Sequence, residues 1–383
     1  NWNSPSDGAI ELALVKHKAT GTKKGSLLLN PGGPGGSGWD YVYYSGASSA
    51  TAAVSEAYDI VGWDPRGVGK STPVTCYTDP KQTDEVLYGT FDSPYGTQGW
   101  IDELTVEEEK FAAACQQNTG ELLANLDTAS NAKDMDMIRA LVGDEKLNYL
   151  GYSYGTYFGA VYAELFPDKV GRLVLDGALD PLLSDFESLK VQMAGFDSAF
   201  RAYMQFCLQG SDCPFSGDVD TALGQARTVL ETVDAQGLVN SDGRVLDSAT
   251  LGTAIALNLY SEDYWPDMTQ MFAELSTGDP TLAFVNADYY NSRNADGSYS
   301  SNSFEVYTAA TCVDGDFADD PATTLDRLAE IDAAAPILGK FFAYDDFAVL
   351  DTACSNWPVP RADLPTSFEA KGAPPILVIG TTN

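Results

Sequence analysis

The first half of the chain alternates short apolar runs with segments of helical periodicity. Strand-like runs lie at 10–17, 26–30, 58–64, 147–152 and 172–176. Helical spacing of apolar residues marks 107–115 and 128–142, and 155–166 is a further helical segment that ends at Pro167. A repeated strand–helix–strand order predicts a parallel sheet with helices on both faces.

The pattern changes after Pro181, where helical segments separated by Gly-, Asp-, Asn- and Ser-rich loops take over. These segments are 186–207, 219–235, 248–260, 265–276 and 323–334. The sequence PILVIG at 375–380 then returns to a buried-strand pattern. The sequence therefore predicts the first part of a sheet domain at 1–182, a helical cap at 183–340 and a return to the sheet at 341–383.

Composition narrows the class of protein. The 383 residues carry 22 Lys and Arg against 55 Asp and Glu, a formal net charge of −33. Such a charge repels phosphate backbones and argues against a nucleic-acid partner. Hydrophobic residues make up 44%, too many for a disordered chain. We find no apolar run of the about 18 residues that a membrane helix needs.

Six cysteines and a single histidine, His17, limit the metal chemistry. No C-x-x-C pair is present, so we expect neither a zinc site nor a metal or other cofactor. Three disulfides in an exported protein is the favoured interpretation. Cys207 and Cys213 are close enough in sequence to close a small loop. Buried thiols in a cytosolic enzyme are the alternative.

The strongest chemical motif is Gly151-Tyr152-Ser153-Tyr154-Gly155, a G-x-S-x-G. It lies between a predicted strand and a predicted helix, which is the setting of a nucleophile elbow. We therefore expect Ser153 to be a catalytic nucleophile and the N–H of Tyr154 to stabilise an oxyanion. The alternative is a buried serine in an ordinary strand–helix turn.

A glycine-rich loop, NPGGPGGSG at 30–38, follows the strand-like run 26–30. A loop with so little side-chain bulk exposes backbone N–H groups, and Gly33, with Gly32 next, is the expected second oxyanion donor. Gly33, Gly35 and Gly38 also match a dinucleotide fingerprint. Two residues, Pro31 and Gly32, separate that pattern from the strand, and the following residues do not clearly open a helix, so the fingerprint is the weaker interpretation.

The segment WDPRG at 63–67 follows the next strand-like run. An ion pair between Asp64 and Arg66 would brace the elbow. A surface turn fixed by Pro65 and Gly67 is an equally good interpretation. A phosphate-binding loop ending in Gly69-Lys70-Ser71 is excluded, because Asp64 stands where that motif needs glycine.

Together these motifs resemble the tripeptidyl aminopeptidases of actinobacteria, which are secreted α/β-hydrolases related to prolyl aminopeptidases. The matching segments are NPGGPGGSG, GWDPRGVGKS, LGYSYGT, LDGALDP, TCVD and the pattern Cys354-x-x-Trp357-Pro358. The resemblance implies an α/β-hydrolase with a cap inserted after the strand that ends at Asp176, removal of short peptides from free N-termini, and a secreted or cell-surface location. It also implies the disulfides Cys76–Cys115, Cys207–Cys213 and Cys312–Cys354.

The chain departs from that family at the triad, whose order is Ser, then Asp or Glu, then His. The family places its acid just after the strand that follows the cap, where this chain has only 381–383, and its histidine after the last strand. His17 precedes Ser153 and has the wrong chain order. Asp176 is the fallback acid, and Asp351 is not favoured.

We therefore expect an inactive piece cut at both ends, without the last strand and the histidine segment. Pairing with its own C-terminal segment as a separate chain and a non-catalytic relative are the alternatives.

For the intact enzyme we expect acyl transfer through Ser153 to water, with peptides that carry a free N-terminus as substrates. Carboxylates in the cap suit recognition of an ammonium group. Asp314 and Glu305, near the return from the cap to the sheet, are the candidates, although most acids of this chain are expected to lie on the surface. A carboxylesterase or lipase would use the same serine, and a non-catalytic binding protein would show neither activity.

Overall fold

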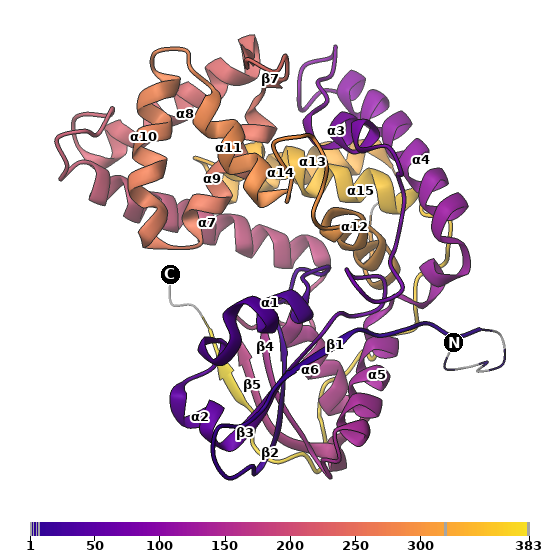
Figure 1. Cartoon of the computed structure of the whole chain (residues 1–383). Coiled ribbons are helices and arrows are strands. Elements are labelled where there is room, and N and C mark those ends of the chain that lie inside the picture. The colour runs from indigo at the N-terminus through magenta and orange to yellow at the C-terminus, as the bar shows by residue number, and fades with distance from the viewer. Residues whose placement is uncertain (1, 3, 5, 7, 318–319, 381–383) are drawn as a thin grey trace.

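Six strands form one sheet in the order β1-β3-β2-β4-β5-β8 in the computed structural model, which describes residues 2, 4, 6, 8–317 and 320–380 (Figure 1). β1 pairs antiparallel with β3, and all other neighbours in the sheet are parallel. The strands are β1 (Leu14–His17), β2 (Gly25–Asn30), β3 (Tyr58–Trp63), β4 (Leu147–Tyr152), β5 (Val170–Asp176) and β8 (Leu377–Ile379). The predicted, mostly parallel sheet is confirmed, and residues 381–383 lie outside the described residues.

Helices cover both faces of the sheet because its strands are apolar on both sides. Leu28 of β2 packs into a cluster with residues of α5 and α6, whereas the next residue, Leu29, packs with Val42 of α1 on the opposite face. The helices are α1 (Gly38–Ser45) and α2 (Ala52–Ala57) on one side and α5 (Thr128–Leu141) and α6 (Tyr154–Leu165) on the other. Alternate side chains of a strand point to opposite faces, which explains this division.

The cap is helical, as predicted, but it draws on more of the chain than one insertion. Tyr88 and Trp100, from the segment before the elbow, belong to the same apolar cluster as the cap residues Phe200 and Phe341. The helices α3 (Pro80–Tyr88) and α4 (Gln98–Thr119) accordingly lie beside the cap in Figure 1. The cap thus differs from the predicted boundaries 183–340, because α14 (Gly339–Asp345) and α15 (Phe347–Ser355) also pack in this cluster.

The remaining cap elements follow the periodicity only in part. Five helices match predicted segments: α7 (Asp185–Cys207), α8 (Val219–Gln236), α9 (Ser248–Leu259), α10 (Trp265–Leu275) and α13 (Pro321–Ala334). α11 (Thr281–Tyr290) and α12 (Ser303–Asp314) were not predicted, nor was the small hairpin of β6 (Leu238–Val239) and β7 (Val245–Leu246). Short 3₁₀ turns occupy Gly46–Ser49, Gly120–Asn125, Pro167–Lys169 and Glu262–Tyr264. Within the described ranges no helix is long and apolar enough to cross a membrane.

Three disulfides tie these elements together and confirm the expected pairing. Cys76 bonds Cys115, Cys207 bonds Cys213, and Cys312 bonds Cys354. The third bond joins α12 to α15, and the first joins the segment after β3 to α4. A covalent link between distant segments restricts the unfolded chain and so favours the folded state.

The proposed ion pair between Asp64 and Arg66 is wrong. Arg66 instead pairs with Asp134 of α5, with its Nη2 at 2.9 Å from Oδ1 and its Nε at 2.5 Å from Oδ2. Both side chains are buried, at 5% and 3% exposure. The carboxylate of Asp64 faces the other way, toward α1, so the turn separates the two charges.

Removing one partner of this buried pair tests its contribution to stability. Asp134→Asn leaves the guanidinium of Arg66 buried without a counter-ion, which we expect to lower the free energy of unfolding by about 3–5 kcal/mol. Urea titration of both proteins measures the difference. In the control, Asp220→Asn removes a carboxylate that is 80% exposed and paired with Arg201, and it should cost no more than about 1 kcal/mol. Equal losses in the two variants would contradict the structural role of the buried pair.

Candidate active site

Ser153 occupies a sharp turn between β4 and α6. Its backbone lies in the left-handed region, with φ 50° and ψ −124°, and the residue is exposed. The N–H of Ser153 donates to the carbonyl of Asp176 at 3.0 Å, and its own carbonyl accepts from the N–H of Thr156 at 2.8 Å. A non-glycine residue held in this conformation by its surroundings is the backbone strain expected of a nucleophile elbow.

The two glycines of the motif are needed because β4 and α6 approach closely at this turn. A Cβ on Gly151 would lie 2.4 Å from the carbonyl oxygen of Gly155. A Cβ on Gly155 would lie 2.7 Å from Oδ1 of the buried Asn30. Any side chain here would push the helix away from the strand and move Ser153.

The glycine-rich loop lies directly against the elbow. A Cβ on Gly32 would lie 2.5 Å from the carbonyl oxygen of Tyr152 and 2.9 Å from Cβ of Ser153. The N–H of Gly32 already donates to Oδ1 of Asn30 at 2.9 Å. Within the described residues, the N–H groups of Gly33 and Tyr154 have no hydrogen-bond partner. The loop, which touches Ser153 through Gly32, and the start of α6 therefore each leave one backbone donor without a partner.

A helix does follow this loop, contrary to the expectation from sequence. α1 begins at Gly38, and Oγ of its N-cap, Ser37, accepts from the N–H of Asp40. Asp64 occupies this N-terminus: its Oδ1 accepts from Oγ of Ser37 at 2.5 Å and from the N–H of Trp39 at 3.1 Å. Since a carboxylate already fills the anion position that a pyrophosphate would need, the dinucleotide interpretation is excluded.

The only histidine lies far from Ser153. His17 is exposed at the end of β1. It pairs with Ile60, three residues before the carboxyl end of β3, whereas Ser153 follows the carboxyl end of β4. Three strand spacings, about 14 Å, separate β1 from β4 in the sheet order. This distance excludes His17 as the base for Ser153 in this structure.

The fallback acid, Asp176, ends β5 directly beside the elbow. It pairs with Tyr152 in the sheet, and its carbonyl holds the N–H of Ser153. Asp351, in contrast, is buried in the cap, where Arg327 lies 3.4 Å from its Oδ1. Of these two acids, only Asp176 stands next to Ser153 along the sheet.

Asp314 connects the cap to the elbow through its side chain. Its Oδ2 accepts from the phenol of Tyr154 and from Oγ1 of Thr128, both at 2.5 Å, and its Oδ1 accepts from the N–H of Thr128 at 3.0 Å. Burial raises the pKa of Asp314 to about 6, against the opposing effect of these donors. The carboxyl group also lies in the last turn of α12, where the helix dipole disfavours negative charge. Asp314 and Tyr154 are thereby joined in one buried network.

Glu305 is also buried, in the first turn of α12. Its Oε1 accepts from the N–H of Tyr77 at 2.9 Å, and burial raises its pKa. Both Glu305 and Asp314 are 8% exposed. Both predicted amine-binding acids are therefore buried and accept hydrogen bonds from the protein itself. The structure does not bring their carboxylates together in one site.

Two supporting residues escaped the sequence analysis. Asn30 fixes Gly32 and lies under Gly155, and Thr128 holds Asp314. A polar residue that ends an apolar strand, as Asn30 does, is the signal that could have identified the first. No local signal marks Thr128, because its partner is 186 residues away.

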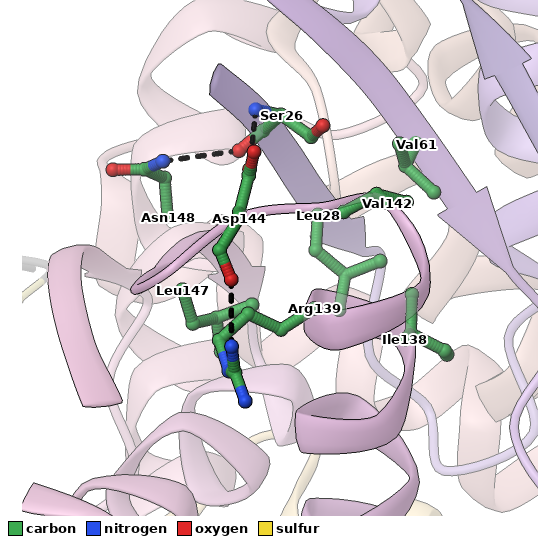
Figure 2. Close-up of a pocket in the computed structure, with 9 residues that line it drawn as sticks. All are labelled: Ser26, Leu28, Val61, Ile138, Arg139, Val142, Asp144, Leu147 and Asn148. Carbon is green, nitrogen blue, oxygen red and sulfur yellow. Dashed lines mark hydrogen bonds between the residues drawn. The ribbon is translucent and has the colours of Figure 1, made fainter.

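A small pocket lies at the opposite end of the sheet and is not part of this site. It is lined by residues at the starts of β2 and β4 and the end of α5 (Figure 2). Its polar groups bond one another: Asp144 accepts from the N–H of Ser26, and Asn148 donates to the carbonyl of Ser26 (Figure 2). In the part of the chain that the structure describes, no group of three His, Cys, Asp or Glu side chains could hold a metal ion.

The ionisation of Asp314 gives a prediction for stability against pH. The folded pKa of about 6 exceeds the ordinary value of 3.8, so the unfolded chain releases this proton at lower pH. The contribution of Asp314 to the free energy of unfolding should therefore be greatest below about pH 4 and fall as the pH rises to about 6. Relative to Asp314→Asn, the free energy of unfolding of wild type should fall by up to about 3 kcal/mol across this window, since each pKa unit corresponds to about 1.4 kcal/mol.

Urea titrations at several pH values measure this difference. Asp363→Asn, which removes an exposed carboxylate, should change stability equally at all these pH values. A constant difference between wild type and Asp314→Asn would show that burial does not shift the ionisation of Asp314.

Comparison with known proteins agrees with this geometry. Residues 25–383 match the family model for the alpha/beta hydrolase fold. The serine protease Hip1 of Mycobacterium tuberculosis is 35% identical over 405 residues, covering 100% of this chain and 74% of the relative. Carboxylesterase B of the same species is 36% identical over 394 residues, covering 100% and 73%. The tripeptidyl aminopeptidase of Streptomyces lividans is 31% identical over 389 residues, covering 99% and 70%.

These matches span nearly the whole chain, and so they include the residues of the strands, the elbow and the cap. The chain belongs to the α/β-hydrolase family, in the group that includes the mycobacterial serine protease and the Streptomyces tripeptidyl aminopeptidase.

Proposed function

We propose that the chain carries the nucleophile of a serine exopeptidase that removes tripeptides or similar short peptides from free N-termini. One observation carries the proposal: Ser153 is held at a positive φ next to two backbone N–H groups, of Tyr154 and Gly33, that lack partners in the described structure. The names of the relatives, serine protease and tripeptidyl aminopeptidase, support peptides as the substrates.

The proposed reaction has two steps. Oγ of Ser153 loses its proton to a base and attacks the carbonyl carbon of the scissile peptide bond. The N–H groups of Tyr154 and Gly33 stabilise the oxyanion of the tetrahedral intermediate, which collapses as the leaving amine takes the proton. Water then attacks the acyl-enzyme, giving the short peptide as a free acid and regenerating the serine.

The base in this proposal is a histidine outside the 383 residues, because His17 lies about 14 Å or more from β4. A segment that adds a strand beside β8 is its proposed source, either continuous with this chain or as a separate polypeptide. The side chains of β8 support this proposal, because Leu377 and Val378 are 56% and 59% exposed. An apolar edge strand of this kind is usually paired or covered. We propose that the 383 residues alone are nearly inactive.

We also propose an extracytoplasmic location. The three disulfides support it, since such bonds persist in oxidising compartments. The net charge of −33 suits an environment in which the protein meets the cationic N-termini of free peptides.

Labelling with a fluorophosphonate tests the nucleophile and the missing base. A polypeptide extended beyond residue 383 with its natural continuation should label at Ser153 at least about 100-fold faster than residues 1–383, because a general base contributes about 10²–10⁴. Ser153→Ala should abolish labelling, and the control Ser241→Ala, at an exposed serine, should leave it unchanged. Absence of labelling in the extended form, or labelling that persists in Ser153→Ala, would reject Ser153 as the nucleophile.

A carboxylesterase is the second candidate, favoured by the relative that bears that name at 36% identity. Both candidates use Ser153, so the substrate decides between them. We expect the extended form to cleave tripeptidyl anilides with a free N-terminus, measured by release of the aniline. Turnover of p-nitrophenyl esters without cleavage of these anilides would favour the carboxylesterase and overturn the exopeptidase.

A further inference from the structure

The helix α12 contacts the glycine-rich loop at its start and the side chain of Tyr154 at its end. At its start, a Cβ on Gly35 of the glycine-rich loop would lie 2.6 Å from the carbonyl oxygen of Ser303. At its end, Asp314 accepts from the phenol of Tyr154. At about 100° per residue, Tyr307 and Asp314 differ by only about 20° around the helix. Tyr307 therefore projects from the same face as Asp314, the face turned toward the elbow.

Tyr307 holds a carboxylate at this face. Its phenol donates to Oδ1 of Asp346 at 2.6 Å. Asp346 lies between α14 and α15, and it retains partial exposure. Within the described residues this phenol is the only side-chain donor bonded to Asp346. Burial raises the pKa of Asp346, as expected for a carboxyl group with few donors and no neighbouring cation.

An aromatic cluster lies near Tyr307, the residue that holds this carboxylate. The phenols of Tyr290 and Tyr260 are close enough to Tyr307 to raise its pKa, after the larger effects of burial and of Asp346. The rings of Tyr260 and Tyr290 are 6.3 Å apart, and these residues are 64% and 43% exposed. The ring of Phe196 lies 6.4 Å from that of Tyr260. Exposed tyrosines grouped near a carboxyl group with a single side-chain donor form a surface that suits a cationic ligand.

We propose that Asp346, Tyr307, Tyr260 and Tyr290 form the subsite for the free ammonium group of a peptide substrate. The carboxylate supplies the opposite charge, and the aromatic faces attract a cation while packing against the first side chain of the peptide. This role differs from that of Asp314 and Glu305, whose carboxylates already serve backbone donors. The proposal rests on the serine exopeptidase function, since the subsite would fix where a bound chain begins.

The position of Tyr307 agrees with a substrate of short, defined length. From Ser303, which touches the glycine-rich loop, Tyr307 lies four residues along α12, a rise of about 6 Å. An extended acyl group of three residues spans about 10–11 Å. The subsite is separated from the loop by one helical turn and the length of a tyrosine side chain. A tripeptidyl group can therefore place its N-terminus there while its last carbonyl reaches Ser153.

Peptide binding tests the subsite without requiring catalysis. Isothermal titration of residues 1–383 with a tripeptide amide and with its N-acetylated form compares the two ligands directly. We expect the free-amine peptide to bind at least about tenfold more tightly. In Asp346→Asn this preference should disappear, and in Tyr307→Phe it should weaken. The matched control, Asp326→Asn, removes an exposed carboxylate of the same cap and should keep the preference.

The outcomes separate this inference from the proposed function. Equal binding of the two peptides, binding of neither, or a preference that survives in Asp346→Asn would overturn the subsite. Circular dichroism of each variant establishes that the fold is intact. If the extended form labels at Ser153 while wild type shows no amine preference, the subsite fails and the nucleophile stands. If the amine preference is found but Ser153 does not label, the serine chemistry fails instead.

Discussion

The turn at Ser153 is the constraint on which the rest of the structure depends. A residue with a side chain stays at φ 50° only if its neighbours prevent relaxation. Here the carbonyl of Asp176 holds its N–H, and β4 and α6 meet at glycines where any Cβ would clash. The glycine-rich loop presses against the same turn. Ser153 can therefore keep this conformation only when β4, the glycine-rich loop and α6 are all in position.

The cap takes part in the same constraint through α12. Asn302, just before this helix, accepts from the N–H of Gly69 and donates to the carbonyl of Gly67. At the other end Asp314 bonds Tyr154, the residue that follows the nucleophile. The disulfide Cys312–Cys354 fastens α12 to α15. A displacement of α12 would thus disturb both the turn at Gly67 and Gly69 and the side chain of Tyr154.

The many carboxylates of this chain have several different structural roles. Asp64 caps α1, Asp134 neutralises Arg66, and Asp314 joins the cap to the elbow. Each of these has protein donors around it, and so each serves the fold. Asp346 is distinct because one phenol donates to it and aromatic rings lie nearby. Count and position in the sequence could not separate these cases, since they differ only in the donors that surround each group.

By itself, the sequence determined the parts of the fold whose signals are local. Apolar runs fixed the strands, and β4 and α6 lie within one residue of the predicted ranges, because the elbow combines strand, turn and helix signals in ten residues. Tertiary structure alone decided the rest. The helices α3 and α4 pack against the cap, and Arg66 pairs with Asp134 rather than with Asp64. The carboxylate of Asp314 is buried and accepts hydrogen bonds from Thr128. These outcomes depend on contacts between residues far apart in the chain, whose energies arise from burial and pairing that no local pattern records.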